Sequence, residues 1–187
     1  MNKPKRAFLA MLFSFALVIM ALPCLAFAEG DVASNGDTAF VTGHVASVST
    51  TAGEQYYIFI ESALAAANTA GTATITLLAD VRTTATLTFT GSDITLDLNG
   101  HGIDADGGEF SVITVNGSAT LTLTDSNSTA SNTVGSTSVS GGYITGGRGY
   151  QNNSDASAYN WYFYGGGVYV ASSGNFIMSG GTILGNA

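Results

Sequence analysis

The sequence predicts an all-β fold, a right-handed parallel β-helix (solenoid) with a short N-terminal capping helix. Short apolar segments are separated by glycine pairs at close spacing, as in Gly165-Gly166-Gly167-Val168-Tyr169-Val170. A related phrase, Gly-Gly followed by Tyr or Thr and then Ile, occurs at residues 141–144 and again at 180–183. Repeated strand and turn chemistry of this kind is typical of solenoid proteins.

The first 28 residues have the features of a secretory signal peptide. Lys3, Lys5 and Arg6 precede an apolar run, and residues 26–28 (Ala-Phe-Ala) supply a small-x-small cleavage site. We therefore expect an extracellular or cell-surface protein, with no membrane insertion after the signal is cleaved.

Two alternatives for this segment fit less well. As a retained membrane anchor the apolar run is shorter than the roughly 20 residues that a span needs. As a lipoprotein signal it carries Cys24, but Pro23 stands where a small residue should precede the cysteine.

The charge of the chain limits its partners. Cleavage removes three of the five cationic residues and no acidic residue, so the formal net charge of −8 becomes −11, with Arg82 and Arg148 remaining. A surface as acidic as this repels phosphate backbones, which excludes nucleic acid as a partner.

The predicted mature chain contains no cysteine, so its stability must come from packing and backbone hydrogen bonds rather than from disulfides.

The elements follow in order. Residues 29–55 are rich in Ser, Thr, Ala, Gly and Asp and form a lead-in segment to which we assign no function. In residues 56–71, Ile60, Leu64 and Ala67 fall near helical spacing, which predicts one short helix. A helix at this position would cover the apolar end and unpaired strand edges of a repeat array.

Residues 72–187 are expected to form the β-helix coils. Apolar and polar residues alternate, which places one set on a buried face and a threonine-rich set opposite; the buried set includes Ile75, Leu77, Leu87, Phe89, Ile94, Leu96 and Leu98. The main rival is a flat β-sandwich, which does not need the recurring Gly-Gly phrase. We expect the chain to be the N-terminal fragment of a longer protein that frays or self-associates at its open end, residues 180–187.

Several segments resemble a known family. Residues 75–81, 96–100, 121–125 and 165–170 together look like the repeat region of secreted bacterial surface proteins with a pectin-lyase-like right-handed β-helix. The resemblance implies a large adhesin-like or cell-wall-associated protein, usually of undefined ligand, in which many such coils form a stalk or display surface. We expect its partner to be a glycan or a host or cell-surface protein. The Gly-Gly phrases are also similar to the short repeats of polymorphic outer-membrane autotransporters.

Enzymatic alternatives rest on few residues. Gly100-His101-Gly102 is similar to a motif of β-helical polygalacturonases, but glycosidic hydrolysis needs two carboxylates at one bond, and no Asp-Asp pair is found. Lyases of this fold use an arginine base beside clustered aspartates, and Arg82 and Arg148 lie in no such motif. The alternative function is therefore the N-terminal part of a polysaccharide lyase or glycoside hydrolase whose catalytic coils follow residue 187.

Asp104, Asp106 and Glu109 surround Gly107-Gly108 and form an acidic loop. Oxygen donors on a turn suit calcium, although the spacing is not that of an EF-hand. Calcium is the one cofactor that the sequence suggests. Solvated turn carboxylates are the alternative interpretation.

Aromatic residues gather before the Gly-rich strand, and exposed rings beside Asn and Asp suit stacking against sugars; the candidates are Tyr159, Trp161, Tyr162 and Tyr164. The alternative is that these rings pack against the strands.

Threonine alternation also resembles ice-binding solenoids, but it lacks a regular register. Asn99, Asn116 and Asn186 are expected at turns, where their amides satisfy unpaired backbone groups. The sequence thus favours a secreted, non-catalytic structural or adhesive module that displays loops.

Overall fold

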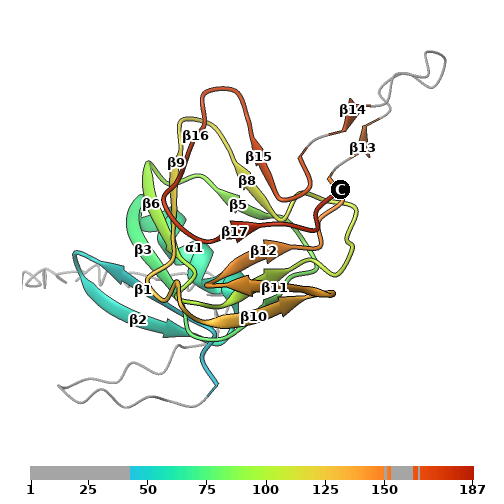
Figure 1. The fold of residues 1–187 in the computed structure, drawn as a ribbon. Helices are drawn as coiled ribbons and strands as arrows, with labels where there is room; N and C mark the ends of the chain where they lie inside the picture. The colour runs from blue at the N-terminus through green and yellow to red at the C-terminus, as the bar shows by residue number, and fades with distance from the viewer. Residues whose placement is uncertain (1–42, 150, 153–161, 164) are drawn as a thin grey trace, which may run out of the picture.

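The structure of the protein, a computed structural model, describes residues 43–149, 151–152, 162–163 and 165–187 (Figure 1). Its largest sheet has six strands, in the order β16 (Asn175–Met178), β9 (Thr120–Thr124), β6 (Asp93–Asp97), β3 (Thr72–Leu77), β1 (Ala46–Thr50) and β2 (Gly53–Tyr57). The pairs β2–β1 and β1–β3 are antiparallel, whereas β3, β6, β9 and β16 pair in parallel. The sheet is therefore mixed.

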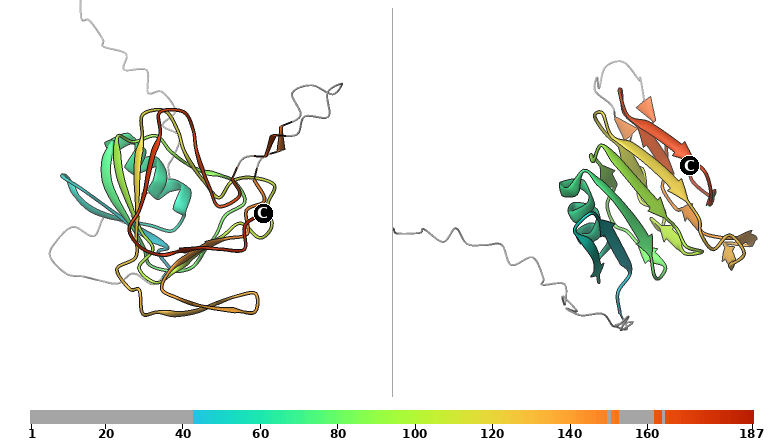
Figure 2. Two further views of the ribbon diagram at one scale, coloured as in Figure 1. Left: turned by 45° about the horizontal axis from the view of Figure 1, so that its top comes forward. Right: turned by 90° about the vertical axis from the view of Figure 1, so that its left-hand side faces the viewer.

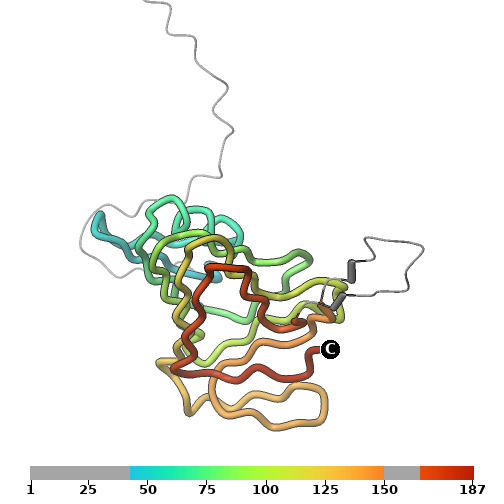
Figure 3. The backbone as a smooth tube through the Cα atoms, turned by 90° about the horizontal axis from the view of Figure 1, so that it is seen from above, coloured from blue at the N-terminus to red at the C-terminus, as the bar shows by residue number. Residues whose placement is uncertain are grey.

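Two smaller sheets are parallel throughout. One contains β17 (Thr182–Ile183), β12 (Tyr143–Thr145), β7 (Gly102–Asp104) and β4 (Val81–Arg82). The other contains β15 (Val168–Val170), β8 (Ile113–Val115) and β5 (Leu87–Phe89). Strands that follow one another along the chain belong to different sheets, and each sheet adds its later strands toward the same side. The N-terminal elements and the C-terminal strands therefore lie at opposite ends of the molecule (Figures 2 and 3).

Two antiparallel hairpins interrupt this progression on either side of β12. The first pairs β10 (Ser131–Val134) with β11 (Thr137–Ser140), and the second pairs β13 (Gln151–Asn152) with β14 (Tyr162–Phe163). Each forms a two-stranded sheet of its own. Both hairpins are therefore insertions beside the four-stranded sheet.

A single described helix, α1 (Ile60–Ala70), packs against β1, β3 and β5. Its spacing of apolar residues buries one face, formed by Ile60, Ala63, Leu64 and Ala67. The helix ends at Gly71, whose φ of 76° favours glycine and whose N–H donates to the Ala67 carbonyl. The Asn68 side chain then joins the helix to the end of β5, donating to the Thr88 carbonyl and accepting from the Thr90 N–H.

The core lies between the three sheets and α1. Alternate strand residues point inward, and those of β3, β5, β6 and β9 are almost completely buried, as predicted for Ile75, Leu77, Leu87, Phe89, Ile94, Leu96 and Leu98. The threonines between them are partly exposed. The predicted alternation of faces is therefore confirmed.

The predicted fold class is wrong. The chain is not an all-β parallel β-helix but a mixed α/β structure, with a mixed six-stranded sheet, a helix packed against its strands and two further parallel sheets. The sequence pattern failed because alternation reports which face of a strand is buried but not the direction of its neighbour. Residues 43–55, read as a lead-in, supply β1 and most of β2, whose antiparallel pairs give the sheet its mixed character.

Candidate functional site on the four-stranded sheet

The outer face of the four-stranded sheet carries a group of polar and aromatic side chains. Ile103 and Ile144 are in register and fully buried, so their neighbours Gly102 and Tyr143 point to the opposite, outer face. Tyr143 lies directly across from Gly102, and a Cβ added to that glycine would overlap the tyrosine ring. The ring therefore covers the glycine and remains partly exposed.

Carboxylates flank this ring. Burial raises the pKa of the Tyr143 hydroxyl, and the negative charges of Asp80 and Asp104 raise it further. Both effects disfavour the phenolate, the first through loss of hydration and the second through repulsion. Tyr143 consequently remains a neutral donor and acceptor beside two carboxylates, a combination suited to the hydroxyl groups and apolar ring faces of a sugar.

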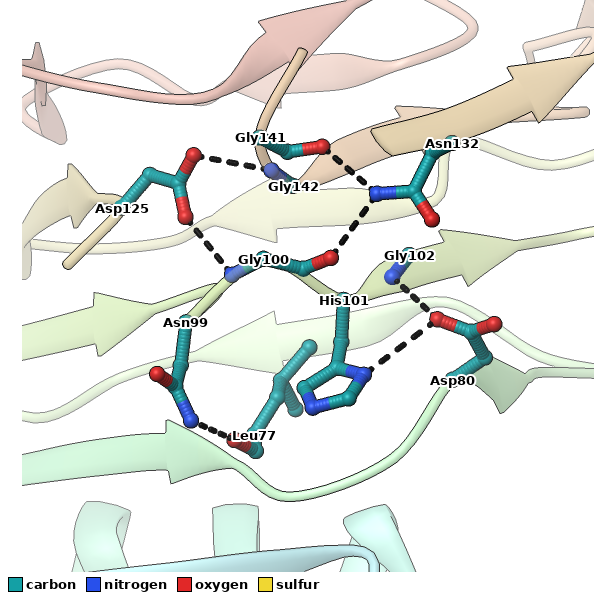
Figure 4. A network of polar contacts seen from close by, with 10 residues as sticks. All are labelled: Leu77, Asp80, Asn99, Gly100, His101, Gly102, Asp125, Asn132, Gly141 and Gly142. Atoms are coloured by element: carbon teal, nitrogen blue, oxygen red, sulfur yellow. Dashed lines mark hydrogen bonds and ion pairs between the residues drawn. The ribbon is translucent and has the colours of Figure 1, made fainter. Parts of the chain in front are cut away.

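His101 stands beside Asp80 in this group. Its Nδ1 lies 3.5 Å from Asp80 Oδ1, and the same oxygen accepts a hydrogen bond of 2.8 Å from the Gly102 N–H (Figure 4). Asp80 therefore fixes the backbone of the turn as well as the imidazole.

The predicted calcium residues have partners of their own. Asp104 Oδ1 accepts the Asp106 N–H at 2.7 Å, and the Asp106 carboxylate forms an ion pair with Arg82. The hydrogen bond and charge of Asp106 raise the pKa of the Arg82 guanidinium. Glu109 is exposed. Within the part of the chain that the structure describes, no three His, Cys, Asp or Glu side chains form a group that could hold a metal ion, and calcium binding stays a prediction.

A network of polar side chains holds the turns that lead into β7 and β12 (Figure 4). One carboxylate, that of Asp125, accepts from the Gly100 N–H at 2.7 Å and from the Gly142 N–H at 2.8 Å. The Asn132 amide donates 2.8 Å hydrogen bonds to the carbonyls of Gly100 and Gly141. These two side chains join the turn that precedes His101 to the turn that precedes Tyr143, so the site is built on a fixed backbone.

The predicted turn asparagines behave in two ways. Asn99 donates to the Leu77 carbonyl at 2.9 Å, and Asn186 donates to the Ile144 carbonyl at 3.1 Å while accepting from the Gly147 N–H. Their expected role of satisfying backbone groups is confirmed. The Asn116 side chain accepts from the adjacent Gly117 N–H at 2.9 Å, so its described side-chain bonding is local.

Most of the predicted aromatic loop lies outside the described residues. Tyr159, Trp161 and Tyr164 lie outside the described residues, and Tyr162 is in β14, where its backbone pairs with Asn152. Sugar contact by these four residues remains a prediction.

Sequence reasoning overlooked Tyr143 as a site residue, although a signal was present. The phrase Gly-Gly-x-Ile occurs twice, with Tyr143 in one copy and Thr182 in the other, and these two residues are in register on β12 and β17. The variable position of the repeat therefore lies on the outer face. An aromatic residue at the variable position of a repeat indicates surface chemistry rather than core packing.

Comparisons with protein-family models, with curated proteins and with solved structures each found no match for this chain. Among the residues that the structure describes, no helix has both the length and the apolar character required to cross a membrane.

Proposed function

We propose that this protein is a secreted, surface-exposed structural and adhesive module that contacts glycans without catalysis. One observation carries the proposal: β12, the strand that presents Tyr143, is preceded by the β10–β11 hairpin and followed by the β13–β14 hairpin. A partly exposed aromatic ring on a strand that two inserted hairpins flank along the chain is a suitable arrangement for binding an extended saccharide. The N-terminal signal-like segment supports export.

The non-catalytic part of the proposal rests on how the polar groups are used. Asp80 holds the Gly102 N–H, Asp106 pairs with Arg82, and Asp125 binds two backbone amides. Groups committed to structural contacts are poorly placed to move protons during a reaction. The alternative of a polysaccharide lyase or hydrolase was tied to a pectin-lyase-like fold, and with the correction of the fold class it loses that support.

Glycan-array binding with matched variants tests the proposal. We expect Tyr143→Ala and Trp161→Ala each to reduce binding by about five- to thirtyfold, because loss of an aromatic contact of this kind removes about 1 to 2 kcal/mol. Tyr56→Ala is the control, since Tyr56 lies on β2, remote in topology from the four-stranded sheet. Unchanged binding in both site variants, or no glycan bound by the wild-type protein, rejects the proposal.

A separate assay tests the absence of catalysis. The protein is incubated with a panel of acidic and neutral polysaccharides, and the release of reducing ends and of unsaturated products is measured. We expect neither. Product release that His101→Ala abolishes would identify an enzyme and overturn the non-catalytic assignment.

A further inference from the structure

The turn between β8 and β9 presents an Asn-Gly pair to solvent. Residues 116–118 (Asn-Gly-Ser) are exposed, whereas Val115 before them and Ala119 after them are 0% and 1% exposed. The Asn116 N–H donates to the Phe89 carbonyl at 3.0 Å, and the Asn116 carbonyl accepts from the Ala119 N–H at 3.2 Å. The turn is therefore anchored at both ends while its tip is open to water.

At this tip the side-chain amide of Asn116 lies against the next backbone nitrogen. The Gly117 N–H donates to Asn116 Oδ1 at 2.9 Å and forms no other hydrogen bond among the described residues. Because a carbonyl carbon lies about 1.2 Å from its oxygen, the Asn116 Cγ is within about 4 Å of the Gly117 nitrogen. Gly117 has no Cβ, and apart from the adjacent residues no atom lies within 4 Å of the place where one would stand. The nitrogen therefore has an open approach to the side-chain amide carbon.

A second Asn-Gly pair, Asn99-Gly100, has the opposite construction. The Gly100 N–H donates to Asp125 Oδ1 at 2.7 Å, so a carboxylate holds the nitrogen that would have to attack. The Asn99 side chain donates to the Leu77 carbonyl at 2.9 Å and accepts from the Ser126 hydroxyl at 3.2 Å. Gly100 is buried, and a Cβ there would overlap neighbouring side chains. In this pair the amide and the nitrogen are held in separate contacts within crowded surroundings.

We propose that Asn116 is a site of spontaneous deamidation in the folded protein, with water as the only co-reactant. The Gly117 nitrogen gives up its proton and bonds to the Asn116 Cγ, while the side-chain nitrogen takes up a proton and leaves as ammonia. The product of this step is a cyclic succinimide that joins the two residues. Water then adds to one of the two succinimide carbonyls and breaks its bond to the ring nitrogen. Opening at one carbonyl gives aspartate, and opening at the other gives isoaspartate.

The reaction changes the turn in two ways. Either product adds one negative charge at the exposed tip. Isoaspartate also adds one methylene to the main chain between β8 and β9, and it converts the carbonyl that accepts from the Ala119 N–H into a pendant carboxylate. Val115 and Leu121, both fully buried, are then no longer joined by the turn described above. The proposal is independent of glycan binding, because β8 and β9 belong to sheets other than the one that carries Tyr143.

Incubation of the purified protein at physiological temperature and mildly alkaline pH, followed by peptide mapping with mass spectrometry, tests the proposal. We expect Asn116 to deamidate at least about tenfold faster than Asn99, because an intramolecular attack is strongly slowed when the reacting groups are held apart. Both aspartate and isoaspartate should appear at position 116. Asn35, which precedes Gly36 outside the described residues, falls in a separate peptide. Equal rates at Asn116 and Asn99 in the folded protein overturn the proposal.

The urea-unfolded chain is the matched control for the folded protein. Both asparagines precede glycine, so once the folded contacts are lost their rates should differ by less than about threefold. A tenfold preference for Asn116 that persists in urea would show that the neighbouring sequence, and not the folded turn, determines the rates. An Asn116 that stays intact in the folded protein but reacts in urea would show that the turn protects it. Either result contradicts the proposal.

Two alanine substitutions test the role of the attacking nitrogen. Gly117→Ala places a methyl group beside this nitrogen and should slow the reaction at Asn116 at least about tenfold. Gly135→Ala is the control, because Gly135 also lies at an exposed turn, with a φ of 60° against 61° for Gly117, but does not follow an asparagine. It should leave the rate at Asn116 unchanged. An undiminished rate in Gly117→Ala would show that ammonia is lost without attack by residue 117, and the proposal would then be rejected.

Discussion

The ring of Tyr143 occupies the space that a side chain at Gly102 would need. The two residues face each other across neighbouring parallel strands, β12 and β7, on the outer surface of the sheet. Gly102 is itself buried, because the ring covers it. The glycine therefore determines where the most prominent aromatic group of the site lies.

Gly102→Ala should displace this ring. The added methyl group overlaps the far end of the tyrosine side chain, which moves outward, and overpacking of this kind costs about 1 to 3 kcal/mol of unfolding free energy. In a Tyr143→Ala background the same substitution should cost less than half as much, since nothing then occupies the space. Urea unfolding of the four proteins measures the coupling, and additive costs would show that the ring does not lie over residue 102.

The ionisation of Tyr143 should affect stability at high pH. Burial, followed by the charges of Asp80 and Asp104, raises its pKa above the ordinary value, so the unfolded chain ionises at a lower pH than the folded protein. Between these two pKa values the unfolded state binds fewer protons than the folded state, so stability falls with pH. The contribution of Tyr143 to the unfolding free energy is fully present below the unfolded pKa of about 10 and is lost as the pH rises through the folded pKa.

The comparison with Tyr143→Phe isolates this effect. Between neutral pH and pH above about 10, the unfolding free energy of the wild-type protein should fall more steeply than that of the variant. Tyr57 provides a second group whose pKa burial raises, and it is retained in both proteins, so its contribution cancels. Parallel pH profiles for the two proteins would show that Tyr143 titrates in the folded protein as it does in the unfolded chain.

Asp125 should be the most important acidic residue for stability among those of the turn network. Asp125→Ala removes hydrogen bonds to the Gly100 and Gly142 N–H groups and leaves two partly buried donors unpaired, at a cost of about 2 to 4 kcal/mol. Asp125→Asn should cost less, because an amide retains one accepting oxygen. Thermal and urea unfolding measure the differences.

Asp93→Ala is the matched control for Asp125. Its carboxylate is exposed and forms none of the described side-chain hydrogen bonds, so its removal should change the unfolding free energy by less than about 0.5 kcal/mol. If Asp125→Ala proves as mild as Asp93→Ala, the carboxylate does not join the two turns in solution.

The sequence was sufficient to predict the buried faces of strands such as β3 and β6, but not the strands β1 and β2, which fall largely in the predicted lead-in segment. Ile75, Leu77 and Leu96 alternate with threonines, and this alternation follows directly from the geometry of an extended chain. The predicted fold class, an all-β parallel β-helix, was wrong, because the direction of strand pairing depends on long-range contacts. Val48 and Ile75 form an antiparallel pair. The local sequence around each of them would look the same if the two strands were parallel.

The candidate site was predicted still less completely. The sequence suggested His101 and the acidic residues as candidates, because their chemistry is recognisable from residue type alone. Tyr143 became a site residue only through its register with Gly102, and Asp125 became a structural residue through contacts with amides 25 and 17 residues away. Such relationships join segments that local patterns treat separately, so a single sequence does not disclose them.

Two substitutions of Asn99 should separate the contributions of its backbone conformation and of its side-chain hydrogen bonds to the unfolding free energy. Its φ of 47° lies in the left-handed region, and its amide donates to the Leu77 carbonyl. Asn99→Gly loses the side-chain hydrogen bonds to the Leu77 carbonyl and from the exposed Ser126 hydroxyl, together about 1 to 2 kcal/mol, while glycine adopts this φ freely. Asn99→Ala loses the same two bonds and also places a Cβ in a conformation that costs about 1 to 2 kcal/mol more.

The order of the two Asn99 variants is therefore the decisive measurement. Urea unfolding should rank the wild-type protein above Asn99→Gly and Asn99→Gly above Asn99→Ala, even though glycine makes the unfolded chain more flexible. If the alanine variant is the more stable of the two, residue 99 does not hold a left-handed conformation in solution. The turn that positions Gly100 and His101, and with it the contact between Asp80 and His101, would then differ in solution from the one described.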